Sequence, residues 1–226
     1  SARRAVRAMV DAEEHRGPDG RGVVACGPAQ DARAPYAVLG HTRLAIIDTS
    51  SAGAQPMGGP DGSPWVSFNG EIYNFGELRR ALSHAGQPFT SQTDTEVILR
   101  GYQAWGADVV QRLRGMFAFA LWDPAEGRLL VARDRLGIKP VYVYRGDGYA
   151  LFASEVRALL ASGLVPRRID VTGLWQYLGY QAPAAPRTLV DGVRAMPPGS
   201  WLSLAGEGAL SEGTYWRMLD SARRPL

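Results

Sequence analysis

The sequence contains one cysteine, Cys26, and one lysine, Lys139, among its 226 residues. A single cysteine excludes an internal disulfide, and a reducing cytoplasm is then the default compartment. The chain lacks an apolar run near the ~18 residues that span a bilayer, and it lacks a signal-peptide pattern, so no membrane partner is expected. Its three histidines are scattered without the spacing of metal ligands, which predicts no metal site.

Charge of one sign is also scarce. The net charge is +3, and the arginines that provide it are mostly interleaved with aspartate and glutamate, so no footprint for nucleic acid is present. What the sequence does have is 46% hydrophobic residues together with 27 glycines and 15 prolines. This composition is typical of a globular protein with one sizeable core, and it contains too many breakers for a helical bundle.

The order of apolar patterns predicts hairpins that alternate with helices. Helical spacing is present over 3–10, 75–84, 94–113, 154–160 and 171–180. Strand patterns are present over 23–26, 36–48, 65–68, 115–123, 129–134, 141–144 and 149–153, with a last hairpin around 196–202. Hairpins of this kind argue for antiparallel sheets covered by helices, which is an α+β fold.

The stretch Trp65–Asn74 carries the first chemical signal. Its strand-prone run ends at Asn69-Gly70, a dipeptide that readily takes positive φ and turns a chain leaving a strand. The side-chain amide of Asn69 and the backbone N–H of Gly70 can then point at one spot. Such a donor pair suits an oxygen that gains negative charge during acyl transfer. An ordinary hairpin turn is the alternative, and for an isolated Asn-Gly it is the commoner one.

Three charged residues extend this hypothesis, each with a plainer alternative. Arg43 begins the apolar half of the run 36–48, where it either faces water at a sheet edge or grips a carboxylate through two hydrogen bonds. Asp94 precedes an apolar helical run, either as the helix cap or as an acceptor for a substrate ammonium. Glu71 follows the Asn-Gly pair and could hold a cationic group of the same substrate.

A series of motifs covers almost the whole chain: His15–Asp19, Arg43–Asp48, Gly53–Met57, Phe68–Asn74, Thr93–Glu96, Gly115–Phe119, Ala132–Pro140, Phe152–Glu155 and Pro197–Gly199. In this order they resemble the amino-terminal glutaminase domain of glutamine-hydrolysing asparagine synthetases. Any one of them would be weak evidence, but as a set they are specific.

The resemblance implies a class II glutamine amidotransferase of the N-terminal-nucleophile hydrolase type. The fold expected is a four-layer αββα sandwich of two antiparallel sheets, here lacking the first strand. Residues 1–216 would form the amidotransferase domain, with its amino-terminal nucleophile segment missing, and residues 217–226 a linker toward an absent synthetase domain. In that family an amino-terminal cysteine thiolate attacks the side-chain amide of glutamine, with its own α-amino group as the base. The ammonia then passes inside the protein to a domain that amidates aspartate with ATP.

Carried over by motif, the resemblance also implies the residues of a glutamine site. Asn69 and Gly70 would form the oxyanion hole, and Arg43 would clamp the α-carboxylate. Asp94 and Glu71 would hold the α-ammonium, and Leu44, Ile46 and Ile47 would wall the same pocket. Charged contacts at both ends of the substrate would distinguish glutamine from other amides.

The sequence departs from the family at its start. Only fourteen residues precede His15, and they have helical spacing, so the nucleophile and the first strand are expected to be missing. Ser1 is in the wrong element to replace the nucleophile, and Cys26 is internal, without a free amine as base. We therefore expect weak binding of glutamine and no turnover from this chain by itself.

Several alternatives remain open at this stage. The chain is interpreted as a fragment of an asparagine synthetase or of a relative that amidates another carboxylate. The alternative is a stand-alone or degenerate domain that binds glutamine without catalysis. A phosphoribosyl- or fructose-phosphate amidotransferase shares the chemistry but fits the motifs less well. The predicted partners are L-glutamine and a synthetase domain in cis, and a homodimer is compatible with the resemblance. No cofactor is expected in this chain, while ATP and Mg²⁺ are expected in the missing domain.

Overall fold

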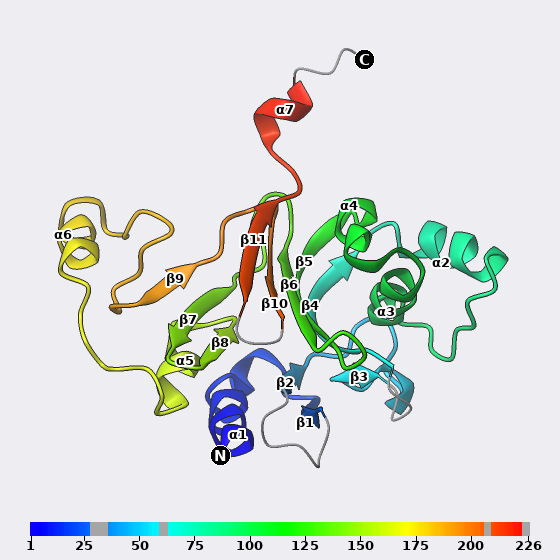
Figure 1. Ribbon diagram of the computed structural model, residues 1–226, viewed down its shortest axis with the longest axis horizontal. Coiled ribbons are helices and arrows are strands. Elements are labelled where there is room, and N and C mark those ends of the chain that lie inside the picture. Colours follow the sequence, from blue (N-terminus) through cyan, green and yellow to red (C-terminus); the bar gives the residue numbers. More distant parts are fainter. Residues whose placement is uncertain (28–35, 59–62, 206–208, 223–226) are drawn as a thin grey trace.

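The computed structural model describes residues 1–27, 36–58, 63–205 and 209–222 (Figure 1). Its largest element is a six-stranded antiparallel sheet in the order β11-β10-β6-β5-β4-β3. The strands are β3 (Met57–Gly58), β4 (Trp65–Ile72), β5 (Gly115–Asp123), β6 (Arg128–Arg133), β10 (Ser200–Leu204) and β11 (Leu210–Thr214). Strands β4 and β5 are paired along their whole length, from Trp65 opposite Trp122 to Ile72 opposite Gly115.

Two smaller antiparallel sheets face the large one. One pairs β1 (Gly20–Cys26) with β2 (Ala37–Arg43), and the other has the order β8-β7-β9, made of β7 (Tyr142–Gly146), β8 (Tyr149–Ala153) and β9 (Val193–Ala195). Both contribute to one apolar core with the large sheet, in which Leu39 and Val143 pack with Trp122 and Val131. They therefore lie on the same face of the large sheet and form one layer.

Helices cover both outer faces. The helices are α1 (Ala2–Ala12), α2 (Phe75–His84), α3 (Asp94–Trp105), α4 (Val109–Arg112), α5 (Val156–Ala161), α6 (Val171–Tyr180) and α7 (Met218–Ala222), with 3₁₀ turns at Glu14–Arg16, Ser51–Gly53 and Gly106–Asp108. Leu82 of α2 and Ile98 of α3 are buried against the large sheet, and Met9 of α1 is buried with Leu159 of α5 and Leu151 of β8. The result is the four-layer αββα arrangement that the sequence predicted.

One close approach explains a glycine inside a strand. A Cβ atom at Gly40 would lie 2.6 Å from Val10 and 2.8 Å from Val6. Helix α1 can therefore rest directly on β2 only because position 40 has no side chain. The sequence pattern is compatible with one strand here or with two strands and a kink at Gly40, and β2 continues through Gly40 as one strand.

The strand predicted over 36–48 is wrong in its second half. Strand β2 ends at Arg43, where its partner β1 begins at Gly20, and residues 44–48 form no strand. The N–H of Ala45 donates instead to the Asp19 carboxylate at 2.9 Å. Without a neighbouring strand the apolar run has nothing to pair with, and it continues as a surface loop.

The predicted turn at Asn69-Gly70 is also wrong. Both residues lie inside β4 and are paired with Ala118 and Phe117 of β5. Gly70 does take a positive φ of 150°, but it uses this freedom within the strand. A Cβ atom there would lie 2.1 Å from the Met116 carbonyl oxygen, so the close contact with β5 requires glycine.

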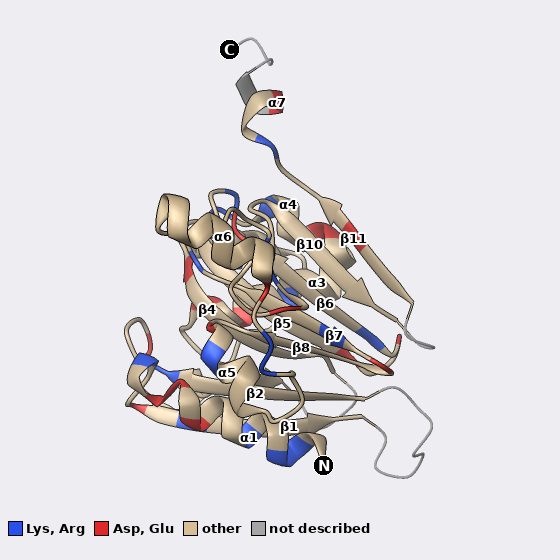
Figure 2. Cartoon of the chain, turned by 90° about the vertical axis from the view of Figure 1, so that its left-hand side faces the viewer, with Lys and Arg blue, Asp and Glu red and all other residues tan. Residues whose placement is uncertain are grey.

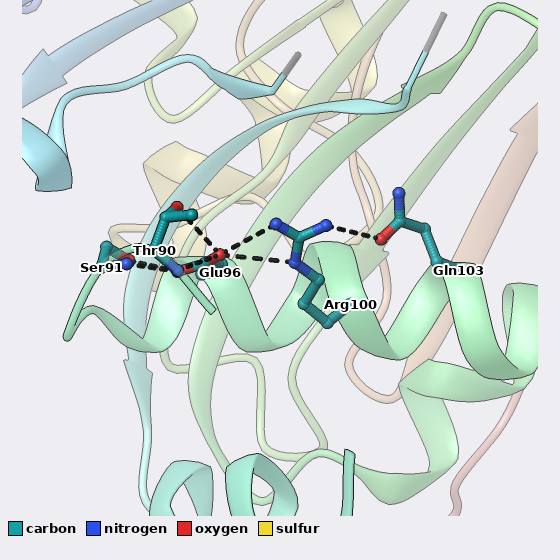
Figure 3. A network of polar contacts seen from close by, with 5 residues as sticks. All are labelled: Thr90, Ser91, Glu96, Arg100 and Gln103. Carbon is teal, nitrogen blue, oxygen red and sulfur yellow. Dashed lines mark hydrogen bonds and ion pairs between the residues drawn. The ribbon is translucent and has the colours of Figure 1, made fainter. Parts of the chain in front are cut away.

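Helix α3 begins with a polar cap that fixes the position of Asp94. The N-cap is Thr93, whose hydroxyl accepts from the Thr95 N–H, so the carboxylate of Asp94 is free for another partner. Glu96 accepts from the backbone N–H groups of Thr90 and Ser91 and pairs with Arg100 (Figure 3). Burial by itself would raise the pKa of Glu96, but these hydrogen bonds have the larger combined effect and lower the pKa.

The remaining predictions agree with the structure except at the carboxyl-terminal end. Helices α2 and α6 have the predicted bounds, and the hairpins β5–β6 and β7–β8 are present. The last hairpin is formed by β10 and β11, later than the predicted 196–202. In the predicted linker 217–226, residues 218–222 form α7, and residues 223–226 lie outside the described part. No helix in the described ranges has the length and hydropathy to cross a membrane.

Candidate active site

The edge of β4 that faces away from β5 carries the first element of the site. Backbone N–H groups alternate along a strand, so those of Phe68, Gly70 and Ile72 point to this same edge. The N–H of Phe68 donates to Gln55 Oε1 at 2.7 Å, and the N–H of Ile72 donates to Asp94 Oδ2 at 2.9 Å. Strand β3 pairs only with the start of β4, at Trp65 and Val66.

Gly70 is the donor that this edge leaves open. Its N–H lies between two that side chains satisfy, and no backbone or side-chain acceptor beyond the strand ladder is found for it among the described residues. A half-buried backbone N–H normally has a hydrogen-bond acceptor, so a donor without one is unusual. An oxygen atom of a ligand could accept from it. The backbone around Gly70 thus offers a preformed donor at a fixed place.

Asn69 and Glu71 point to the face of β4 that turns toward the second layer. Residues 67, 69 and 71 alternate with the buried Val66, Phe68 and Ile72, which face α2 and α3. Asn69 lines a cavity between the layers, together with Ser67 and residues of β2. The Asn69 amide and the Gly70 N–H therefore lie on adjacent residues of one rigid strand, in place of the flexible turn predicted for them.

Arg43 ends β2 and is held by the loop that follows it. Its guanidinium donates to the backbone carbonyl oxygens of Ser50, at 2.9 Å, and of Asp48. A Cβ atom at Gly53 would lie 2.9 Å from the Asp48 carbonyl oxygen and 2.4 Å from Arg43 Nη2, so the loop closes tightly around this glycine. The Asp48 carboxylate in turn accepts from the Gln92 N–H at 3.1 Å, which joins the loop to the start of α3.

Asp94 is buried at the amino end of α3. Burial is the main reason why its pKa is raised, and the negative charge of Glu71 adds to this, while the hydrogen bond from the Ile72 N–H opposes it. A carboxylate in such surroundings gains from a cation placed beside it. Since Ile72 directly follows Glu71, the two acidic residues lie at the same end of β4.

The structure thus gathers most of the predicted site residues around this end of β4. Asn69, Gly70 and Glu71 are consecutive in the strand, Asp94 bonds to the next residue, and Arg43 is joined to the start of α3 through the loop 48–50. The three apolar residues predicted to wall the pocket lie on the exposed loop after Arg43: Leu44, Ile46 and Ile47. They form no buried wall in this structure.

Sequence reasoning missed three residues that shape the site. Gln55 binds both the N–H and the C=O of Phe68 and also donates to Thr95 Oγ1, so one side chain replaces a neighbouring strand. His41 contacts Ser67 through Nδ1 at 3.3 Å, and Ser67 donates its only hydroxyl hydrogen to the Gly40 carbonyl at 2.9 Å. Nδ1 is consequently the donor, and Nε2 keeps a free lone pair.

The signals for these residues in the sequence were indirect. Gln55 belongs to the motif Gly53–Met57, which was recognised without a role for its amide. For His41 the sequence indicates only that it lacks the spacing of a metal ligand, which favours a core or surface role. Both roles depend on which strand lies opposite, and the sequence pattern does not provide that.

Cys26 is excluded as a reactive group. It is buried, and burial raises the pKa of its thiol to about 12. A thiol with this pKa stays protonated near neutral pH and is a poor nucleophile. The burial of Cys26 agrees with the interpretation of this residue as a small buried side chain.

A cavity of about 960 Å³ lies beside the site, between the two small sheets. Residues of β2, β8, α1 and the large sheet line it, including His41, Asn69 and Trp122. Strands β2 and β8 each end their sheet, so each has one edge without a strand partner in the described part of the chain. The indole N–H of Trp122 is buried and has no partner among the described residues.

Comparison with known proteins gives the family. A model described as "Glutamine amidotransferase domain" matches residues 1–216. The chain belongs to the glutamine amidotransferase family. Two solved structures share the fold. A glutamine phosphoribosylpyrophosphate amidotransferase from B. subtilis has a TM-score of 0.67 at 19% identity, over 94% of this chain and 47% of that one. The second, an allosteric regulatory enzyme of purine biosynthesis, has a TM-score of 0.64 at 20% identity, over 95% of this chain and 46% of that one.

Similar curated proteins include glutamine-hydrolysing asparagine synthetases. Asparagine synthetases 1 and 3 of Bacillus subtilis are each 36% identical to this chain, over 90% and 93% of its length. The amidase chyE of Penicillium rubens is 35% identical over 92% of the chain. The chain spans 29–33% of the length of these relatives. The resemblance read from the motifs is thereby confirmed at the level of the family.

Proposed function

We propose that this domain binds L-glutamine at the end of β4 and hydrolyses its side-chain amide to glutamate and ammonia. The observation that carries the proposal is the open N–H of Gly70, which lies next to the amide of Asn69 and between the hydrogen bonds made by Gln55 and Asp94. Donors fixed on a strand need no reorganisation when negative charge develops on an amide oxygen.

The other residues of the site would bind the amino-acid end of the substrate. Arg43 would pair with the α-carboxylate, and Asp94 and Glu71 would hold the α-ammonium. The mutual repulsion of two neighbouring carboxylates is relieved by a cation between them. A ligand with one cation and one anion on the same carbon fits this arrangement of charges.

The nucleophile would come from an extended segment in the cavity between β2 and β8. A strand there would pair with both open edges and join the two small sheets, and a carbonyl oxygen of this strand could accept from Trp122 Nε1. In the proposed chemistry a cysteine thiolate at the start of that segment attacks the amide carbon, and the oxyanion is held by Asn69 and Gly70. Ammonia leaves with a proton from the cysteine α-amino group, and water then hydrolyses the thioester to glutamate.

We further propose that the ammonia is used by a synthetase domain of the same polypeptide. Similarity to asparagine synthetases supports aspartate as the acceptor, with ATP and Mg²⁺ in that domain. The similarity to an amidase keeps another carboxylate as the alternative acceptor. Because a cysteine thiolate requires reducing conditions, a compartment such as the cytoplasm would suit it. A homodimer stays a proposal without a specific interface.

The binding half of the proposal can be tested on this chain directly. Titration calorimetry should detect weak binding of L-glutamine, and the variant Arg43→Gln should lose it. Arg80→Gln removes an equally charged but exposed side chain of α2 and should bind as the wild type does. Binding that is unchanged in Arg43→Gln would refute the assignment of the carboxylate clamp.

The catalytic half requires the proposed nucleophile. We expect glutamate release when a strand segment that begins with cysteine is fused before Ser1, and no release when this cysteine is replaced by alanine. A fused chain that binds glutamine but releases no glutamate would instead favour the alternative function, a non-catalytic glutamine-binding domain.

A further inference from the structure

Helix α6 exposes its apolar face to solvent, which is unusual for a helix on the surface of an isolated domain. Val171, Trp175 and Leu178 follow the spacing i, i+4, i+7, so they form one stripe along the helix. A surface helix normally buries such a stripe. Here the three residues are 77%, 77% and 69% exposed.

The opposite side of α6 is the one that touches the protein. A Cβ atom at Gly173, the single buried residue of the helix, would lie 2.2 Å from the Thr188 carbonyl oxygen. Asp170 caps the helix by accepting from the Gly173 N–H at 2.7 Å, and Gln176 Oε1 accepts from the Ala184 N–H at 3.0 Å. Backbone contact and polar hydrogen bonds therefore hold α6 in an orientation that keeps its apolar stripe outside.

A contiguous apolar stripe of this kind is rare on a surface that stays in water. Single exposed apolar residues need no explanation, but a row of large ones usually marks an interaction site. Trp175 is also the residue type that most often anchors such contacts. The helix has no charged residue that would keep a partner away.

The position of α6 indicates where the partner lies. Figures 1 and 2, which differ by a quarter turn, both place α6 in the upper part of the molecule, toward the end from which α7 leaves. At that end Met218 and Leu219 of α7 are also exposed, beside a shallow cavity that Leu136 lines. The similar asparagine synthetases are about three times as long as this chain, and the family match ends at residue 216.

We infer that the stripe Val171, Trp175 and Leu178 is the surface against which a further domain of the same polypeptide packs, after the chain leaves through α7. This inference rests on the proposed function, because that function requires a second domain to use the ammonia. Docking on α6 would fix the orientation of the two domains and so the route between their sites.

Hydrogen exchange compares this chain with the full-length polypeptide. We expect the backbone N–H groups of 171–180 to exchange at least tenfold more slowly in the full-length protein. The double variant Trp175→Ser with Leu178→Ser should abolish this protection. Thr172→Ala changes an exposed residue of the same helix outside the stripe and should retain it.

The outcomes separate this inference from the proposed function. Protection of α6 without any glutamine hydrolysis would support the docking surface and refute the function. Equal exchange of α6 in both proteins, with hydrolysis intact, would overturn the docking surface alone. Protection of α6 in this chain by itself, together with a dimer in light scattering, would also overturn it, because a second copy would then be the occupant.

Discussion

Replacing His41 with glutamine should make the domain less sensitive to acid. Burial, and then the positive charge of Arg43, lower the pKa of His41 from 6.5 to about 4. The folded protein therefore keeps His41 neutral at pH values where the unfolded chain binds a proton. The stability that depends on the neutral ring is complete above pH 6.5 and is lost as the pH falls toward 4.

The size of this effect follows from the pKa change. At ~1.4 kcal/mol for each unit, a change from 6.5 to about 4 corresponds to a loss of about 3 kcal/mol of unfolding free energy. This figure is an upper limit, because His41 lines a cavity and is only half-buried by surface area, so water there would moderate the cost of charge. A loss of this size is a large fraction of the 5–15 kcal/mol that stabilises a typical domain.

Urea unfolding between pH 7.5 and pH 4 measures the effect. Glutamine at position 41 keeps a side-chain N–H for Ser67 Oγ, so at pH 7.5 the variant should lose only about 1 kcal/mol. Its unfolding free energy should then fall less than that of the wild type as the pH is lowered. The control His84→Gln changes an exposed histidine of α2 and should keep the wild-type profile. Parallel profiles for His41→Gln and the wild type would refute the reasoning.

Three further predictions concern the edge of β4. Gly70→Ala should lower the unfolding free energy in urea by at least about 3 kcal/mol, because its Cβ atom would collide with β5. The control Gly86→Ala also has a positive φ but open space around its Cβ atom, so it should lose only about 1–2 kcal/mol. Equal losses in the two variants would contradict this explanation. Gln55→Leu should lower the unfolding free energy by about 2–4 kcal/mol, since it leaves the N–H and C=O of Phe68 unpaired. A loss below about 1 kcal/mol would argue that the Gln55 side chain does not replace a neighbouring strand. Asp94→Asn should abolish glutamine binding in calorimetry and also remove a pH dependence. Because the pKa of Asp94 is raised in the folded state, the unfolding free energy of the wild type should fall as the pH rises through that pKa. If Asp94→Asn shows the same dependence of unfolding free energy on pH as the wild type, burial of the Asp94 charge is not costly.

The sequence predicted most helices and hairpins well because they depend on local patterns, whereas the four layers were implied by the family resemblance. The helix over 75–84 is bounded by breakers and has a clear period, and the hairpins of 115–133 and 142–153 are joined by short turns. The run 44–48 was misjudged because an apolar sequence forms a strand only where a second strand lies beside it. At Asn69-Gly70 only Gly70 takes a positive φ, and pairing with β5 keeps the chain extended.

The site could be predicted in its chemistry more than in its geometry. The charges of Arg43, Glu71 and Asp94 and the donors at 69–70 are proposed from residue type and motif. Gln55 and His41 were not, because an amide that replaces a strand and a neutral buried imidazole have no signature in one sequence. Their functions arise from neighbours that are distant along the chain, at Phe68 and Ser67.

The end of β4 contains two energetically unfavourable features that a fold selected for stability alone would avoid. The carboxylate of Asp94 is buried beside a second negative charge at Glu71. Among the described residues no acceptor beyond the strand ladder is found for the N–H of Gly70, which lies between two N–H groups that side chains satisfy. Leucine or asparagine at 94 and a longer β3 would remove both conflicts without changing the layers. Conflicts of this kind tend to gather at functional sites, where a ligand resolves them. A cationic group beside Asp94 and an oxygen at Gly70 would resolve both, and a single amino acid bearing a side-chain amide supplies the two together.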